Sequence, residues 1–357
     1  MTSSYPQFDC LSIWFFSGTG NAQFAAEQIK ANAEKLAINA TVQRMLSKKS
    51  NFDPFDENTL IGFCYPTHGF NAPPSVLKFL WHFPKGKNKV FLLNTRAGLK
   101  LYKIHLPGIG GIALWLPALI MFLKGYKPIG FRPLDMPSNW ISLHPGIREK
   151  VIESIKKHCT CTLERFSKRI LTGKPVLNGF LWFPVDIALI PISIAYYLGG
   201  RFFIAKTFFA NYNCNSCGLC IKQCPVKAIV EKDKRPYWTF NCESCMKCMN
   251  SCPKRAIETA HGFTFLLWWT IFSALSGFVV KLIVHYNILP IELIQGSFGL
   301  VQNAITIIIS FAIVYIAYRL LHQLLGLKLI NRIITYTSLT HFKFWRRYYN
   351  NSVKILD

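Results

Sequence analysis

Acidic residues are scarce in this chain of 357 residues, which has 17 Asp and Glu against 41 Lys and Arg and a formal net charge of +24. This balance favours an anionic partner, either nucleic acid or the anionic face of a membrane. The basic residues form no dense run of the kind seen in nucleic-acid-binding arms, so no nucleic-acid partner is predicted. The N-terminus also lacks a charged region followed by an apolar one, so no secretory signal is expected there.

Two nucleotide-binding motifs are absent as well. The first apolar run of the chain, residues 10–16, ends in the turn SGTGN at 17–21. This turn is not a dinucleotide-binding G-x-G-x-x-G motif, and it is not a Walker A loop because no Lys follows it. The sequence also shows no acid and base set around a substrate pocket, which weakens the prediction of an enzyme with its own substrate.

Cysteine is present at fixed intervals between residues 214 and 252. Eight of the twelve cysteines lie here, in two sets spaced C-x2-C-x2-C-x3-C-P with a period of 28 residues, which indicates an internal duplication. Three thiolates at two-residue gaps can hold three corners of one iron–sulfur cube, while the fourth ligates the other cube. The predicted ligands are Cys214, Cys217, Cys220 and Cys252 for one cluster, and Cys242, Cys245, Cys248 and Cys224 for the other.

This motif resembles that of bacterial two-cluster ferredoxins, with all eight ligands present. The alternatives are a pair of four-cysteine zinc sites and a disulfide framework. Zinc ribbons usually carry two C-x2-C pairs further apart, without the third cysteine and the CP ending, so two 4Fe-4S clusters are preferred. Iron–sulfur ligands need reduced thiolates, which predicts a cytoplasmic location for this part of the chain.

The first 175 residues alternate apolar strands with helices, which predicts a parallel α/β sheet covered on both faces. A strand, a Gly-rich turn and a helix in succession direct backbone N–H groups at a phosphate. Strands are expected at 10–16, 60–66 and 89–94 and within 126–140, and helices after the first turn, from Pro74 to about Phe83, over 109–123, and from Pro145 to about Leu171.

The stretch IWFFSGTGNAQFAAEQI resembles the phosphate loop of flavodoxins, which have a doubly wound α/β sheet and bind FMN. That family usually has Thr where this chain has Ala22, so one hydroxyl donor is lost. The resemblance implies that the loops after two later strands flank the flavin ring at the carboxyl ends of the sheet. The implied FMN-binding residues are Ser17, Gly18, Thr19, Gly20, Asn21 and Ala22, then Pro66, Thr67, His68, Gly69 and Phe70, then Asn94, Thr95, Arg96, Ala97 and Gly98.

Apolar segments in the second half divide into two kinds. Residues 180–198 are long enough to span a bilayer, but they contain two prolines and Asp186, and an Asp at a helix centre costs about 2.5–3.5 kcal/mol. A crossing there would also separate the two domains, so a kinked interfacial or packed segment is predicted. The helix over 109–123 is too short to cross and is expected to lie on the domain or on a membrane.

Residues 264–284 and 298–321 are each near or above twenty residues long, with charges only at their ends, which predicts a transmembrane hairpin. The connector 286–297 has no Lys or Arg, whereas seven follow from Arg319 onward, so both termini are predicted to be cytoplasmic. The alternative, a buried hairpin in a soluble domain, is disfavoured because a ferredoxin-like domain has too small a core. His261 and His322, at the cytoplasmic ends, are candidate haem or quinone contacts.

These predictions give five parts: a flavodoxin-like FMN domain at 1–175, a connector at 176–210, a two-cluster ferredoxin domain at 211–260, a transmembrane hairpin at 261–325 and a basic cytoplasmic tail at 326–357. The arrangement resembles flavodoxin–ferredoxin fusion proteins of the "EFR" family. We expect a membrane-anchored protein that transfers electrons between FMN and two 4Fe-4S clusters, with lipid and a redox protein or quinone as partners. The alternatives are an FMN- and iron–sulfur-dependent oxidoreductase acting on a substrate such as a quinone, and a redox-sensing adaptor.

Overall fold

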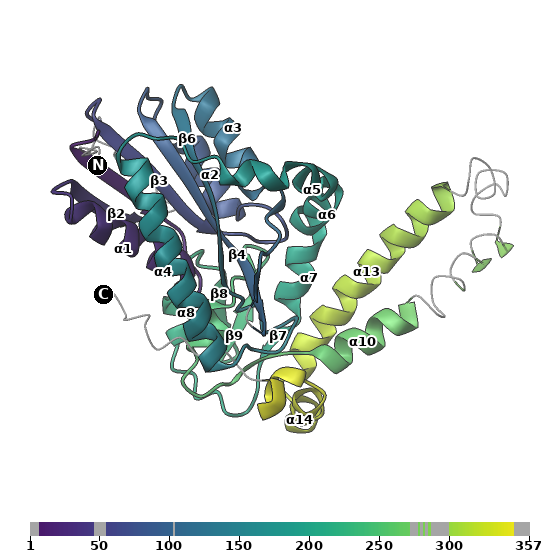
Figure 1. The fold of residues 1–357 in the computed structure, drawn as a ribbon. Helices are drawn as coiled ribbons and strands as arrows, with labels where there is room; N and C mark the ends of the chain where they lie inside the picture. The colour runs from purple at the N-terminus through teal and green to yellow at the C-terminus, as the bar shows by residue number, and fades with distance from the viewer. Residues whose placement is uncertain are drawn as a thin grey trace.

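The computed structural model describes residues 7–45, 55–102, 104–271, 278, 281–282, 285–286 and 300–345. These residues form a six-stranded sheet with helices on both faces, a small cysteine-rich region, and two helices that extend away from the rest (Figure 1).

Five strands of the sheet are parallel, in the order β2-β1-β3-β4-β6, which is the order of flavodoxin-like doubly wound folds. The predicted strands are present, and β3 reads as a continuous buried apolar run because both faces of the sheet are covered. Two short edge strands, β2 and β5, were not predicted. The strands are β1 Cys10–Phe15, β2 Asn39–Arg44, β3 Thr59–Pro66, β4 Lys89–Leu101, the antiparallel β5 Ile104–Leu106, and β6 Lys127–Pro137.

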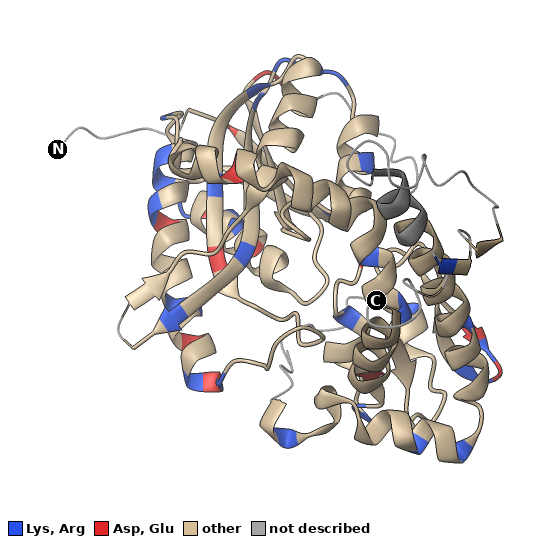
Figure 2. Cartoon of the chain, turned by 90° about the vertical axis from the view of Figure 1, so that its right-hand side faces the viewer, with Lys and Arg blue, Asp and Glu red and all other residues tan. Residues whose placement is uncertain are grey.

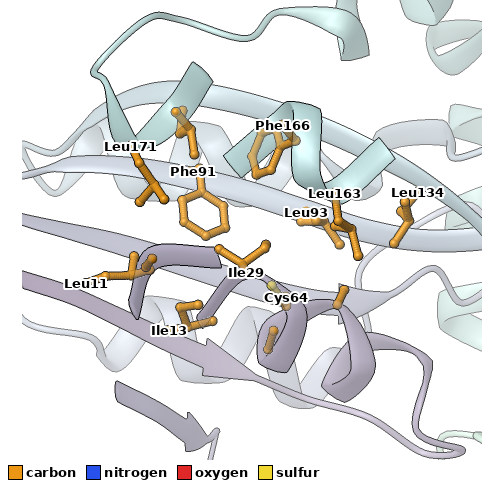
Figure 3. Close-up of a cluster of buried hydrophobic side chains, with 14 of the residues drawn as sticks. Leu11, Ile13, Ile29, Cys64, Phe91, Leu93, Leu134, Leu163, Phe166 and Leu171 are labelled. Atoms are coloured by element: carbon orange, nitrogen blue, oxygen red, sulfur yellow. The ribbon is translucent and has the colours of Figure 1, made fainter. Parts of the chain in front are cut away.

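Helices on the two faces of the sheet enclose two separate cores. Helices α1 (Asn21–Glu34) and α4 (Glu149–Leu171) cover one face, where residues such as Ile29, Phe91 and Phe166 interdigitate (Figure 3). The other face is covered by α2 (Pro74–His82) and α3 (Trp115–Leu123), with the 3-10 turn η1 (Gly111–Ala113) before α3. The carboxyl ends of the parallel strands are therefore held at one edge by a rigid scaffold.

The connector after α4 is a bent helical segment. It consists of η2 (Asn178–Trp182), α5 (Phe183–Ala188), α6 (Ile190–Ala195), the π-turn η3 (Tyr196–Gly200) and α7 (Arg201–Lys206), and its two halves meet at an angle of 74°. Trp115 donates from Nε1 to the buried Asp186 carboxylate over 2.9 Å, which ties this segment to α3. The bend lies where the sequence predicts a kink.

The cysteine-rich region is bracketed by a two-stranded ribbon. Strand β7 (Phe208–Ala210) pairs antiparallel with β10 (Ile257–Thr259), and β8 (Ile229–Lys232) pairs antiparallel with β9 (Arg235–Trp238). Two short helices, α8 (Leu219–Lys222) and α9 (Lys247–Ser251), follow the two cysteine loops, as expected for a duplicated unit.

The C-terminal part begins with two helices that run away from the body of the protein, α10 (His261–Thr270) and α13 (Leu300–Leu324) (Figure 1). Within the described residues, one helix is long and apolar enough to cross a membrane, Ile307–Leu324, or two if the bent connector counts as one span. Most of the predicted first span beyond residue 271 and nearly all of the connector 286–297 lie outside the described residues. Of the predicted hairpin, the structure therefore describes mainly α10 and α13.

The described part of the tail folds back onto the cysteine-rich region. Helix α14 (Lys328–Tyr336) places the buried Asn331 so that its side-chain amide donates to the carbonyl oxygen of Ala210 over 3.0 Å. The fully buried Glu258 of β10 accepts hydrogen bonds from Asn211 and from Ser338 and Thr340 of the tail. Because these three donors satisfy a carboxylate inside the protein, the tail is part of the fold.

Candidate flavin and iron–sulfur site

The glycine-rich turn closes as a phosphate loop would. Gly20 has φ 99°, a left-handed conformation that suits glycine, and its N–H donates to Ser17 Oγ over 2.9 Å. Helix α1 then begins at Asn21 with no side-chain cap and no acidic residue in its first turn, so its N-terminal N–H groups face no protein carboxylate. The Asn21 side-chain amide donates to the carbonyl oxygen of Pro137 over 2.9 Å.

A pocket with a cavity volume of about 90 Å³ lies at the carboxyl ends of the strands, beside this turn. No Asp or Glu is among the described residues that line it. Eleven of the sixteen residues predicted to bind FMN line it: Ser17, Gly18, Thr19, Asn21, Ala22, Pro66, Thr67, His68, Thr95, Arg96 and Ala97.

The other five predicted residues, Gly20, Gly69, Phe70, Asn94 and Gly98, do not line the pocket. Two of them, Gly69 and Phe70, both have positive φ, and the chain turns away from the pocket at this point. A Cβ at Gly69 would meet the Tyr196 ring, and the Phe70 carbonyl oxygen lies against Gly111. Asn94 lies behind the pocket wall and donates to Thr67 Oγ1 over 2.7 Å, which joins the second and third loops.

Sequence reasoning missed five residues of the pocket, namely Pro137, Ser138, Asn139, Trp140 and Cys245. Pro137 is the last residue of β6 and the next three follow it, so the rule that parallel strands end at one edge would have found them once β6 was placed beside β4. No local signal identifies Cys245, because it reaches the pocket only through packing of the cysteine-rich region against the sheet.

Polar atoms in and beside the pocket lack partners within the protein. His68 Nδ1 is buried without a hydrogen-bond partner among the described residues, and burial lowers the pKa of this imidazole to about 4, which leaves it neutral at pH 7. Arg96 is held in a bidentate pair with Asp135, with its Nε 2.7 Å from Oδ1. An uncapped helix N-terminus, an unpaired imidazole nitrogen and a pocket without carboxylates fit a flavin mononucleotide.

The eight predicted ligand cysteines lie in two groups. Burial raises the pKa of Cys220 to about 11, and the neighbouring thiolates of Cys214, Cys252 and Cys217 add to this rise. Burial also raises the pKa of Cys248, with added contributions from Cys242, Cys245 and Cys224. In both cases the contributing cysteines are those that the spacing assigns to the same cluster, and the ligand assignment stays a prediction. A cluster would hold these thiols deprotonated, because a coordinating metal overrides the effect of burial.

Backbone N–H groups point at the exchanged cysteines in both halves. Ala228 donates to Cys224 Sγ over 3.2 Å, and Ala256 donates to Cys252 Sγ over 3.3 Å, at positions 28 residues apart. Hydrogen bonds to the ligand sulfurs are one of the means by which proteins set the potential of such clusters.

All twelve cysteines lie in the described part of the chain, and none of them forms a disulfide. Among the described residues, no three His, Cys, Asp or Glu side chains converge closely enough to hold a single metal ion.

The two regions meet at the turn that faces the flavin pocket. A Cβ built on Gly18 would lie 2.5 Å from the Cys245 carbonyl oxygen and 3.2 Å from its Sγ, so the glycine turn and the cysteine loop are in contact. The buried Glu243 carboxylate accepts hydrogen bonds from Ser75 N at 2.7 Å and Ser75 Oγ at 2.9 Å, and Trp140 Nε1 donates to the Ser244 carbonyl. Cys245 therefore belongs both to a predicted cluster and to the pocket wall.

Comparison with known proteins agrees with this division. A family model described as a 4Fe-4S dicluster domain matches residues 213–257. No curated protein matches the chain. Of the solved structures, a flavodoxin from the domain Archaea is 14% identical with a TM-score of 0.26, covering 44% of this chain and 99% of that one. A short-chain flavodoxin associated with a non-canonical PDU bacterial microcompartment is 11% identical with a TM-score of 0.28, covering 45% of this chain and 95% of that one. The chain thus joins a sheet of flavodoxin-like strand order to a 4Fe-4S dicluster domain.

Proposed function

We propose that this chain transfers electrons between an FMN bound at the edge of the sheet and two 4Fe-4S clusters, and that α10 and α13 anchor it in a membrane. FMN exchanges one or two electrons and an iron–sulfur cluster exchanges one, so the pair can connect two-electron with one-electron chemistry.

The observation that carries this proposal is the contact between Gly18 and Cys245. Because residue 18 has no side chain, the phosphate turn approaches a predicted cluster ligand directly, and Cys245 itself lines the pocket. Glu243 and Trp140 hold the cysteine loop against the sheet through the hydrogen bonds described above. The chain therefore fixes the two cofactor sites beside each other, without a mobile linker between them.

Anaerobic purification of the full chain, followed by analysis of iron, sulfide and flavin, tests the proposal. We expect about eight iron and eight sulfide per chain from two four-iron clusters, together with FMN and no FAD. Gly20→Val should abolish flavin binding and leave the iron content unchanged, because a β-branched residue is strained at φ 99°.

A matched control is Gly326→Val, where φ is not left-handed and the nearest neighbour of an added Cβ is at 3.4 Å. This variant should keep both flavin and iron. Unchanged FMN content in Gly20→Val would place the flavin elsewhere and contradict the proposal.

The membrane part of the proposal is supported by the surface of α13. Only 22% of the window Ile307–Leu324 is buried, and its mean hydropathy is 1.7. Large apolar side chains are exposed on the described arms, among them Phe265, Trp269, Ile308 and Ile316. The chain has 41 Lys and Arg against 17 Asp and Glu, and some of the basic residues lie along the lower edge of the view in Figure 2. This arrangement suits a protein that holds its basic body against an anionic lipid surface.

Carbonate extraction of membranes tests the anchor. The double variant Ile308→Lys, Ile316→Lys should shift the chain from the carbonate-resistant to the soluble fraction, because each Lys at a helix centre costs about 2.5–3.5 kcal/mol of insertion. The control is Leu36→Lys, Leu329→Lys, which changes exposed apolar residues outside α10 and α13. Retention of the first variant in the membrane would contradict anchoring by α13.

A further inference from the structure

A second pocket is lined by residues of α7 and α13, two helices that converge in Figure 1. Its cavity volume of about 340 Å³ lies within the range of small-molecule sites. The π-turn η3 contributes Leu198 and Gly199 to its wall, and such turns are frequent at functional sites.

Half of the fourteen described residues that line this pocket are Phe or Tyr. Phe240 and Tyr315 are stacked on each other at 6.1 Å between ring centroids and 16° between planes, and Phe203 and Phe311 at 5.1 Å and 20°. The other three rings are those of Phe202, Tyr237 and Tyr318. A wall of this composition favours a ligand with a conjugated ring over an aliphatic one.

The charged groups of this pocket are all cationic hydrogen-bond donors. Lys206, Lys232 and Arg319 line it, and no Asp or Glu is among the described residues that do so. His322 donates from Nε2 to the Lys206 carbonyl over 3.0 Å, which fixes its ring at the pocket wall. By contrast, both ring nitrogens of His261 are engaged, with Ser142 and Leu339, and this residue does not line the pocket. The ligand should therefore present hydrogen-bond acceptors.

Two residues that line this pocket connect it to one of the cysteine groups. Phe240 is two residues before Cys242. Lys206 donates from Nζ to the carbonyl of Trp238, which packs in one core with Cys242 and Cys248. Cys245, of the same predicted group, lines the first pocket. Packing therefore links one cysteine group to both pockets.

We propose that this pocket binds a lipid-soluble quinone. A quinone is flat, carries two carbonyl acceptors for the cationic donors, and reaches a protein from the apolar phase on which α13 exposes its side chains. The inference rests on the proposed electron-transfer function, since a quinone beside a cluster is an electron carrier of that function. An anionic phospholipid would also satisfy the cations, but it gains little from stacked aromatic walls.

Calorimetric titration of the oxidised, full-length chain in detergent with decylubiquinone tests this inference. Binding needs no electron transfer, and iron and flavin contents are measured on the same sample, so failure of this inference is separable from failure of the proposed function. Wild-type protein should bind saturably, with a dissociation constant in the micromolar range.

Gly199→Phe should weaken binding by at least about tenfold, because the new ring would fill the pocket. Its Cβ would meet Phe203 and Phe311 at 3.6 and 3.8 Å, which are ordinary contacts, so the variant should fold. Arg319→Gln should weaken binding through loss of a donor. The matched control Ile316→Phe adds a ring at an exposed position of α13 outside the pocket and should bind as the wild type does.

Three results would overturn the inference: no saturable binding by the wild type, equal binding by Gly199→Phe and the wild type, or displacement of decylubiquinone by phosphatidylglycerol at equal concentration. The last result would identify a lipid-headgroup site.

Discussion

The two cysteine loops have the same backbone and different surroundings. In the outer loop, residues 214–220, Ser216 and Gly218 have φ of 56° and 70°, and in the inner loop, residues 242–248, the equivalent Ser244 and Met246 have φ of 52° and 59°. The outer loop is mostly exposed, whereas the inner loop buries Glu243, Ser244 and Met246 against the sheet and the connector.

The duplicated motif determines the backbone conformation of the two loops, whereas their position in the fold determines how deeply each is buried. The shared ligand spacing gives both loops the same backbone conformation, with left-handed residues at equivalent positions. Burial then decides which cluster a partner can approach: the outer loop meets solvent, while the inner loop faces the flavin pocket through Cys245. Four pairs of matched variants test this difference, and they are ordered by expected effect.

The exchanged cysteines should give the largest effect. Cys224→Ser and Cys252→Ser should each remove one cluster, or about half of the iron, because each cysteine is the fourth ligand of the opposite half. Only Cys224→Ser should also stop electron transfer between flavin and cluster, measured by flash photoreduction. If Cys224→Ser removed the cluster of the outer loop, the grouping would be wrong.

The residues that precede α8 and α9 should give the next effect. Met246→Ala should cost about 2–5 kcal/mol of stability, because it leaves a cavity under a buried side chain. Gly218→Ala should cost only about 1–2 kcal/mol, from a Cβ in a left-handed conformation with no atom within 4 Å. Thermal unfolding followed anaerobically by circular dichroism measures both. Equal losses would mean that the loops are equally buried in solution.

The second residues of the loops should differ by less. Glu243→Ala should cost about 1–3 kcal/mol, because it leaves the Ser75 N–H and hydroxyl without their acceptor. Burial raises the pKa of Glu243 to about 7, so the cost of burying its charge offsets part of this loss. Asn215→Ala, at the exposed equivalent position, should change the unfolding temperature little. A larger effect from Asn215→Ala would reverse the assignment of inner and outer loops.

The two serines should show the smallest difference. Ser244→Ala removes a hydrogen bond of 3.1 Å to the Arg201 carbonyl from a buried hydroxyl and should cost about 1 kcal/mol. Ser216→Ala removes the equivalent bond to the Lys234 carbonyl from an exposed hydroxyl and should cost less than about 0.5 kcal/mol, since water replaces the partner. The same unfolding measurement applies, and a reversed order would show that the inner loop is hydrated.

Much of this arrangement is readable from the sequence because its determinants are local. The grouping of cysteines depends on spacing, and the eleven predicted residues that line the first pocket were implied by the resemblance to flavodoxins. Strand β2 was not predicted because NATVQR lies at the sheet edge and buries little besides Ala40. Phe70 does not line the pocket, and its φ of 64° follows the positive φ of Gly69.

The contacts between regions were not predictable. Cys245 enters the flavin pocket, and Glu243 reaches Ser75, 168 residues earlier in the chain, only because two separately recognisable domains pack in one orientation. The packing of the tail against β10 was also not predictable, because the sequence of this basic, moderately apolar segment does not indicate which strand it contacts. Hydrophobic periodicity predicts helices and strands, and cysteine spacing predicts cluster ligands. The packing of one region against another depends on surface shapes that exist only once each region has folded.

The buried Glu258 imposes an order on the biosynthesis of this protein. Its carboxylate accepts a hydrogen bond from Thr340, 82 residues later, so the ribbon that brackets the cysteine loops stays incomplete until that segment has been synthesised. At about 5–20 residues per second, those 82 residues take several seconds, during which the cysteines are synthesised but the buried carboxylate lacks this partner. We expect an assembly system to reach the cysteines most easily during that interval.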